Sequence, residues 1–173
     1  MKTFNKVLAL VFFVFVSIFN TDDAQAQERL ILMLDGETHS FQSHNYPDHY
    51  LRHRNGVLEL TKISSELDKK DATFKVVKGL WGEETISLES VNFPGYYLRH
   101  QNFVLKLHKA TPDDLFKKDA SFKTWQSVID ENQISFESIN YPGYYIRHQN
   151  FKVSLQKMDK DADLFNKDIT FDF

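Results

Sequence analysis

Histidine and aspartate recur at matched positions along the chain, and their chemistry is the most informative in the sequence. Three histidines stand 47 and 48 residues apart, and an aspartate follows them after 18, 19 and 20 residues: His53 with Asp71, His100 with Asp119, and His148 with Asp168. An imidazole and a carboxylate together offer a directional donor or acceptor and a strong acceptor. Such pairs suit one of two uses, which are holding a polar ligand or tying a loop to the body of the protein.

Each pair belongs to a longer repeated pattern. The segment SVNFPGYYLRHQN (Ser90–Asn102) returns as SINYPGYYIRHQN (Ser138–Asn150), and SHNYPDHYLRHRN (Ser43–Asn55) is a more divergent copy. A second signature closes each copy, as KKDATF, KKDASF and NKDITF. A shared period of this length indicates one structural unit built three times.

Within a repeat, apolar and polar residues alternate in short runs separated by turn signals. Ile86 to Val91 alternates as a half-buried strand does, and Pro94-Gly95 is strong turn chemistry. Four such runs per repeat predict twelve short strands in repeats of about 38–80, 84–127 and 132–173. Closing them in a ring with threefold pseudosymmetry removes exposed sheet edges, so we expect an all-β fold, the β-trefoil.

Few helices are expected beside these strands. Short polar turns near Ser64–Lys69 and Pro112–Lys117 are helix candidates, and no helical apolar period of useful length is apparent after residue 26. The segment Arg29–Leu34 is apolar enough for a strand, although it does not align with the repeats.

The first residues have the parts of a secretory signal peptide. Lys2 and Lys6 precede the apolar run Val7–Phe19, and small residues surround a predicted cut after Ala26. The expected domains are therefore a signal peptide, 1–26, and a single trefoil domain, 27–173, that is secreted or periplasmic. Its formal charge of −3 gives no electrostatic footprint for nucleic acid or an anionic membrane, and the absence of cysteine excludes a disulfide framework.

The motif S-x-N-(Y/F)-P-G-Y-Y-(L/I)-R-H-x-N, followed by K-D-A-(T/S)-F, resembles the arabinofuranose-binding domain of α-L-arabinofuranosidases, the family 42 carbohydrate-binding modules. The resemblance covers roughly Ser40 to Phe173. It implies a β-trefoil that recognises L-arabinofuranosyl side chains of polysaccharides such as arabinoxylan or arabinan. It does not imply catalysis, because in this family the hydrolase chemistry sits on a separate domain.

The resemblance also implies that the matching His and Asp positions hold the sugar. A furanose needs a carboxylate acceptor, a directional donor or acceptor and an apolar wall, and tyrosine or phenylalanine could supply the wall. The predicted sugar-binding residues are His100, Asp119, Tyr96, Asn102 and Phe103 in the second repeat, and His148, Asp168, Tyr144, Asn150 and Phe151 in the third.

The first repeat is expected to hold a weaker site, formed by His53 and Asp71. Its turn has Asp48 and His49 where the other copies have Gly and Tyr, and Gly56 replaces the phenylalanine. The remaining repeated residues are expected to be structural: Asn, Pro and Gly shape the turn, and the recurrent arginine ties neighbouring turns through carbonyl groups.

Catalysis and metal binding find little support in the sequence. Glu89 and Glu137 are the tempting carboxylate pair of a glycosidase, but equivalent positions in different repeats would be kept on separate lobes, where they would tie a loop or face solvent. His49 and His53 are a weak metal candidate. We expect no enzyme, no cofactor and no bound metal.

The predicted partner is an arabinofuranosyl-substituted polysaccharide, with a glycoside hydrolase as a further candidate partner, and the protein is expected to be a monomer. Two alternatives stay open. One is a β-trefoil that binds a protein, as an inhibitor or scaffold, because fold alone does not settle function. The other is an accessory part of an α-L-arabinofuranosidase.

Overall fold

The computed structural model describes residues 21–126, 130, 132–159 and 163–173 of the chain. They form three structural repeats, each with four strand positions, and the first strand of the first repeat is split in two. The strands are β1 (Thr38–Ser40), β2 (Gln42–Ser43), β3 (His49–Arg54), β4 (Val57–Lys62) and β5 (Thr73–Lys78); then β6 (Ile86–Ser90), β7 (Tyr96–Gln101), β8 (Val104–Lys109) and β9 (Phe122–Gln126); then β10 (Gln133–Ser138), β11 (Tyr144–Gln149), β12 (Lys152–Lys157) and β13 (Phe171–Asp172).

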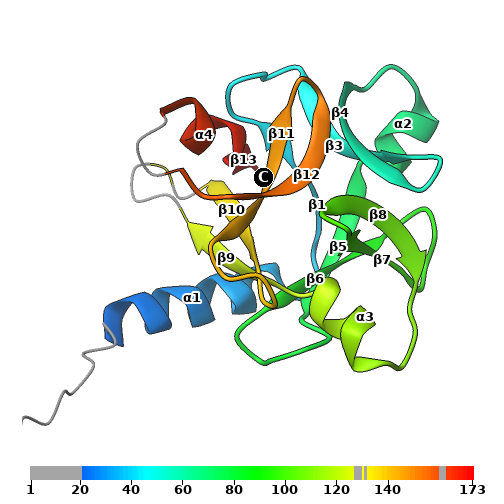
Figure 1. The fold of residues 1–173 in the computed structure, drawn as a ribbon. Coiled ribbons are helices and arrows are strands. Elements are labelled where there is room, and N and C mark those ends of the chain that lie inside the picture. The colour runs from blue at the N-terminus through cyan, green and yellow to red at the C-terminus, as the bar shows by residue number, and fades with distance from the viewer. Residues whose placement is uncertain (1–20, 127–129, 131, 160–162) are drawn as a thin grey trace, which may run out of the picture.

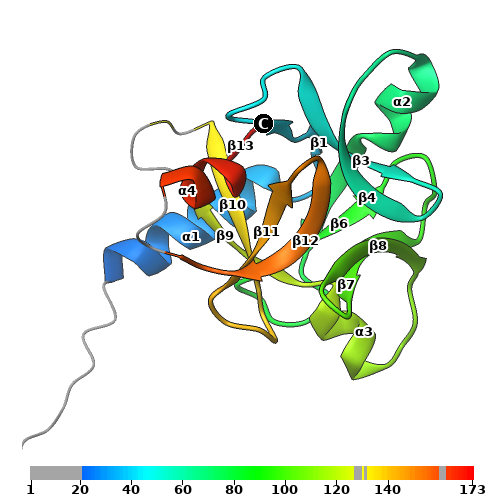
Figure 2. The ribbon, with the colours of Figure 1, turned by 45° about the horizontal axis from the view of Figure 1, so that its top comes forward.

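The first and last strands of the repeats close a barrel. β5 pairs with β1 and β6, β9 with β6 and β10, and β13 with β10 and β2. The two middle strands of each repeat form the hairpins β3–β4, β7–β8 and β11–β12. These hairpins pair with one another through β4, β8 and β12 and lie together on one side of the molecule (Figure 1 and Figure 2). The fold is a β-trefoil, as the repeats predict.

A phenylalanine-rich core fills the barrel. Strand alternation sends every second residue of the barrel strands inward. The fully buried positions include Phe74, Phe122, Phe136 and Phe171 on these strands and Phe41 between β1 and β2. Phe41 packs edge-on against Phe136 with ring centroids 5.0 Å apart, a favoured aromatic geometry. The equivalent phenylalanines of different repeats therefore meet at the centre of the molecule.

A short helix precedes the last strand of every repeat. These helices are α2 (Glu66–Asp71), α3 (Asp114–Asp119) and α4 (Asp163–Asp168), and the first two confirm the predicted helical turns. Ser65 and Asp113 cap the first two by accepting a main-chain N–H from the first turn. Each helix ends on the aspartate of the second signature, and that carboxylate is buried.

The segment Arg29–Leu34 is helical, so the strand predicted there is wrong. No helical apolar period is apparent after residue 26, yet this segment ends a helix. It belongs to α1 (Thr21–Leu34), which lies beside β9 (Figure 1). Leu30, Ile31 and Leu34 fall on one helical face and are buried in the barrel core. Three apolar positions in one turn were too few for the helical period to stand out in the sequence.

The predicted signal peptide lies mostly outside the described residues, which begin at Thr21. Helix α1 runs through the predicted cleavage point after Ala26, and its buried residues Leu30, Ile31 and Leu34 lie beyond that point. Among the residues that the structure describes, no helix is long and apolar enough to cross a membrane.

We expect α1 to contribute substantially to stability through Leu34, which is 0% exposed. Leu34→Ala should lower the free energy of unfolding by about 2–5 kcal/mol, because the core cannot fully close the cavity left behind. Leu32→Ala is the matched control on the same helix, since Leu32 is 63% exposed, and it should change stability by less than about 0.5 kcal/mol. Equal effects of the two substitutions in urea denaturation would contradict the packing of α1.

Candidate functional site

The recurrent polar residues form three equivalent clusters, and each cluster is built by two consecutive repeats. One repeat supplies the histidine and the aspartate, and the next repeat supplies an asparagine from its Asn-x-Pro turn. Site 1 contains His53, Asp71 and Asn92; site 2 contains His100, Asp119 and Asn140; site 3 contains His148, Asp168 and Asn45. The third repeat thus completes its site with the first, which closes the ring.

Site 2 shows the geometry in full. Asn140 donates from Nδ2 to Asp119 Oδ1 at 2.7 Å, and its Oδ1 lies 2.8 Å from His100 Nε2. Ser138 Oγ lies 3.2 Å from the same imidazole nitrogen. Asp119 Oδ2 receives the Arg99 guanidinium in an ion pair. The asparagine amide therefore bridges the imidazole and the carboxylate of the preceding repeat.

The other two sites repeat the asparagine–aspartate bond and the serine–imidazole contact of site 2. In site 3, Asn45 Nδ2 donates to Asp168 Oδ1 at 2.8 Å and Ser43 Oγ lies 2.8 Å from His148 Nε2. In site 1, the corresponding asparagine reaches its aspartate at 2.7 Å, and Ser90 Oγ lies 3.0 Å from His53 Nε2. The motif asparagines therefore do more than shape turns, because their side chains also tie consecutive repeats together; this role is still structural.

The histidine and the aspartate of a site do not bond to each other directly. Their closest nitrogen–oxygen distances are 3.9 Å in site 1, 3.5 Å in site 2 and 3.8 Å in site 3. The direct His–Asp pairing that the sequence offered as a tie is not formed; instead, an asparagine from the next repeat bonds to the aspartate of each site. A carboxylate oxygen has two lone pairs, so Asp119, with one bond to each oxygen, retains acceptor capacity for a ligand hydroxyl.

The recurrent arginine belongs to the sites as well. Arg147 donates from Nε and Nη2 to Asp168 Oδ2 at 3.0 and 2.8 Å, a strong arrangement for a guanidinium–carboxylate pair. Its guanidinium also lies over the Phe165 ring, 4.6 Å from the centroid. The sequence predicted that this arginine binds carbonyl groups, but its main partner is the aspartate of the site. Its recurrence directly before the histidine could have indicated that it belongs to the site.

The polar groups are buried, and this lowers the histidine pKa values. His100 is 3% exposed and Asp119 is 4% exposed. Loss of hydration disfavours the charged imidazolium and lowers the pKa of His53, His100 and His148 below the ordinary value. The neighbouring aspartate partly offsets this effect on each pKa. The imidazoles are therefore neutral hydrogen-bonding groups at pH 7.

Aromatic side chains form an exposed rim around site 2. Phe103 stacks on Tyr144 with centroids 5.5 Å apart, and Tyr141 contacts Phe103 and His100 at 5.1 and 5.3 Å. Tyr141 and Tyr144 come from the third repeat, so Tyr144 lies with His100. The predicted grouping of Tyr144 with His148 is wrong, because the turn that carries it reaches back to the preceding repeat.

The same shift applies to Tyr96, which the sequence grouped with His100. It packs beside Phe93, which contacts His53 in site 1. Site 3 instead receives the divergent turn of the first repeat, where His49 stacks on Phe151 at 5.1 Å. The first repeat contributes to two sites, so its substitutions change both rims. Site 1 has Gly56 in place of the phenylalanine, and site 3 has His49 in place of the second tyrosine.

The rim phenylalanines occupy an unusual backbone conformation. The two-residue turn Asn102–Phe103 has φ values of 52° and 63°, and Asn150–Phe151 has 50° and 62°. Turns of this kind favour Asn-Gly, and Gly56 occupies the same position in the first repeat with φ 76°. The predicted sugar-binding residues Asn102 and Asn150 form these turns. A phenylalanine held where glycine is preferred points to a functional constraint.

Site 1 differs in a further residue that sequence reasoning overlooked. Asp68 stands where the other repeats have Phe116 and Phe165, and it draws Arg52 to 2.7 Å, leaving Asp71 3.8 Å from that guanidinium. Hydrogen bonds from Ser64 lower the pKa of Asp68 to about 2, which keeps it charged. The arginine of site 1 is therefore shared between two carboxylates.

The alternative catalytic and metal sites are not assembled. Glu89 Oε1 accepts the Gly95 N–H at 2.7 Å and Glu137 Oε1 accepts the Gly143 N–H at 2.6 Å, so these carboxylates tie the turns of separate repeats. His49 and His53 lie in sites 3 and 1, which rules out their sharing a metal. No group of three metal-ligating side chains occurs among the described residues.

Comparison with solved structures first defines the class. The Macrolepiota procera ricin B-like lectin in complex with lactose matches with a TM-score of 0.58 and 12% identity, covering 80% of this chain and 94% of that one. At this identity the likeness concerns the fold alone. The protein is thus a β-trefoil of the kind found in lectins.

Closer similarity then defines the family. An arabinofuranosidase complexed with arabinofuranosyl-alpha-1,2-xylobiose matches with 30% identity and a TM-score of 0.72, covering 80% of this chain and 30% of that one. A GH54 α-L-arabinofuranosidase soaked with a cyclic sulfate inhibitor matches equally well over 31% of its length. This chain therefore spans less than a third of those enzymes. A comparison with curated protein sequences returns no match.

The family model of the alpha-L-arabinofuranosidase B (ABFB) domain matches residues 39–173. The chain belongs to this family. The matched region contains all three sites and excludes α1.

The buried neutral histidines predict a pH dependence of stability. A pKa lowered by folding means that the unfolded chain binds more protons, so stability is fully present above about pH 6.5 and is lost as pH falls through the lowered values. Thermal unfolding followed from pH 8 to pH 5.5 should show a falling midpoint below pH 6.5. His100→Gln should reduce this fall, and an unchanged pH profile in that variant would contradict the burial argument.

Proposed function

We propose that the protein is a secreted, non-catalytic carbohydrate-binding protein that recognises L-arabinofuranosyl side chains of plant polysaccharides such as arabinoxylan and arabinan. The observation that carries this proposal is the composition of sites 2 and 3. Each combines a buried neutral imidazole and a carboxylate with an exposed aromatic rim. Sugar-binding sites need this combination of fixed polar groups and apolar surface.

Family membership supports the ligand class. A related arabinofuranosidase, in which the matching region covers 30% of the chain, forms a complex with an arabinofuranosyl-substituted xylobiose. The residues of site 2 lie within the part of the present chain that matches the ABFB domain model. An arabinofuranosyl-substituted polysaccharide is therefore the partner that the evidence favours.

The site supports binding better than hydrolysis. A glycosidase needs two carboxylates that flank one bond at about 5 to 9.5 Å. Asp119 is engaged by Arg99 and Asn140, and Glu137 bonds to a turn of its own repeat. In this proposal the aspartate accepts sugar hydroxyl groups and performs no proton transfer.

Secretion is proposed from the N-terminal sequence. Cleavage after Ala26 would shorten α1 but leave Leu30, Ile31 and Leu34, the buried face, on the mature chain. Removal of the leader is thus compatible with the packing of α1.

The rim phenylalanines provide the sharpest test. Phe103 and Phe151 are 41% and 47% exposed, and Gly56 shows that the fold accepts glycine at the same turn position. The double variant Phe103→Gly, Phe151→Gly should bind an arabinofuranosyl oligosaccharide at least about tenfold more weakly, which is about 1.4 kcal/mol. Each single variant should remove one of two binding sites in calorimetry.

Stability should hardly change in these variants. Lost aromatic contacts, about 0.5–1.5 kcal/mol, offset the relief of a left-handed phenylalanine, about 1–2 kcal/mol. Gly56→Phe is the matched control, because it adds the same ring to site 1 and leaves sites 2 and 3 intact, so binding should not decrease. Wild-type affinity in the double variant would refute the proposal, and no binding by the wild type would favour a protein partner.

A further inference from the structure

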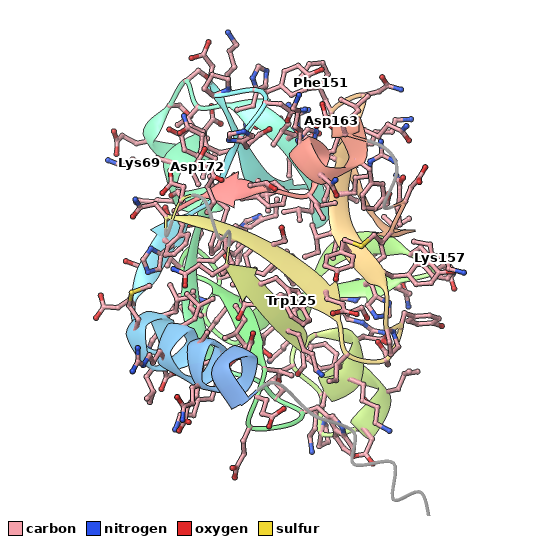
Figure 3. The ribbon with its side chains drawn as sticks, turned by 90° about the vertical axis from the view of Figure 1, so that its left-hand side faces the viewer. Lys69, Trp125, Phe151, Lys157, Asp163 and Asp172 are labelled. Atoms are coloured by element: carbon pink, nitrogen blue, oxygen red, sulfur yellow. The ribbon has the colours of Figure 1, made fainter. Side chains whose placement is uncertain are left out.

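A cavity of about 300 Å³ lies apart from the three histidine sites. It is bounded by the β9–β10 hairpin on one side and by the end of α4 and the approach to β13 on the other. Figure 3 shows Trp125 on this face, with α4, marked by Asp163, above it. The side chains that carry the argument are Trp125, Gln133, Ser135, Asn166 and Thr170.

The lining of this cavity is aromatic and polar but uncharged. All the residues that line it are amides, hydroxyl residues, isoleucines or the tryptophan. Amide and hydroxyl groups donate and accept hydrogen bonds without selecting for charge. The cavity therefore suits a neutral ligand that carries several hydroxyl groups, and its size is at the lower end of small-ligand pockets.

Trp125 is held in place while its ring remains accessible. Its indole Nε1–H donates to Glu137 Oε2 at 2.7 Å, and the other oxygen of that carboxylate accepts the Gly143 N–H. The residue is nevertheless 46% exposed. A fixed, half-exposed indole offers a flat apolar surface at little cost in side-chain entropy.

The tryptophan of this cavity has no equivalent in the first repeat, unlike the histidines of the threefold sites. The residue equivalent to Trp125 in the first repeat is Val77, which follows the same pattern after Phe74. The trefoil framework thus does not require a tryptophan at this strand position. Because Trp125 departs from the repeat and stays exposed, its ring can contact a ligand.

We propose that this cavity, the Trp125 pocket, binds an unsubstituted pyranose residue of a xylan-type main chain, with one apolar face of the ring on the indole and its hydroxyl groups on the surrounding amides. A chair-form xylose presents C–H groups on its faces and hydroxyl groups at its edge, which matches this lining. The choice of xylan as the polymer rests on the proposed function, whereas the preference for a neutral sugar rests on the pocket.

The position of the pocket fits a polymer. Asn166 borders the pocket, and Asp168, two residues further along α4, belongs to site 3. The same short helix therefore separates a pocket for the main chain from a site for its side-chain sugar. Binding both would raise the apparent affinity through effective concentration.

Affinity electrophoresis in debranched xylan, together with calorimetry on xylohexaose, tests the proposal. Trp125→Ala should weaken main-chain binding at least about tenfold, and Asn166→Ala, at an exposed position, should weaken it without affecting folding. Trp81→Ala is the matched control, because Trp81 is also partly exposed but is covered by Lys118, 4.3 Å from the ring. This control should bind like the wild type.

The two proposals fail separately in this experiment. The variant Phe103→Gly, Phe151→Gly should keep xylohexaose binding while losing the arabinofuranosyl ligand. Trp125→Ala should lose xylohexaose binding while keeping the arabinofuranosyl ligand. Wild-type xylohexaose binding in both Trp125→Ala and Asn166→Ala, or no binding by the wild type, would overturn the pocket assignment. Retained arabinofuranosyl binding in the double phenylalanine variant would instead overturn the proposed function.

Discussion

The asparagine bridge between consecutive repeats is the interaction on which the rest of the structure depends. In each site the asparagine amide donates to the carboxylate of the preceding repeat, and in site 2 its oxygen also contacts the imidazole. These groups are buried, and leaving any of them unpaired would cost about 1–3 kcal/mol. Because the third repeat is completed by the first, all three repeats must be folded before all three sites are whole.

This requirement accounts for what the divergent repeat keeps and what it changes. Ser43 and Asn45 are retained because they satisfy His148 and Asp168 from the other end of the chain. Asp48 and Gly56 occupy exposed rim or turn positions, where change does not leave a buried polar group unpaired. The polar interior of the sites is thus conserved across the three copies within the chain, while their aromatic rims differ.

Much of the fold could be predicted from the sequence, since the repeat period, the strand alternation and the turn residues all report local chemistry. Which residues share a site could not be predicted. A period of 47 or 48 residues fits equally well whether His100 lies with Tyr96 or with Tyr144. Only the three-dimensional path of the turn decides between them. The helix at Thr21–Leu34 escaped detection because it carries a single short apolar face and has no counterpart in the repeats.

The residues that differ between the repeats are the ones that the framework does not explain. The left-handed phenylalanines of sites 2 and 3 and the half-exposed Trp125 are not needed to build a trefoil, as Gly56 and Val77 show in the first repeat. They lie on exposed surface beside fixed polar groups. In the proposed function, the rims select the ligand and the buried network holds those rims in position.

A double-mutant cycle on stability tests the inter-repeat bridge most directly. His100→Ala, Asn140→Ala and the double variant should show a coupling energy of about 0.5–3 kcal/mol, the range expected for residues in one hydrogen-bond network. The same cycle for His100 and Asn92, which share a repeat but not a site, should give additive effects. Additivity for His100 and Asn140, or equal coupling in both cycles, would contradict a site formed by two consecutive repeats.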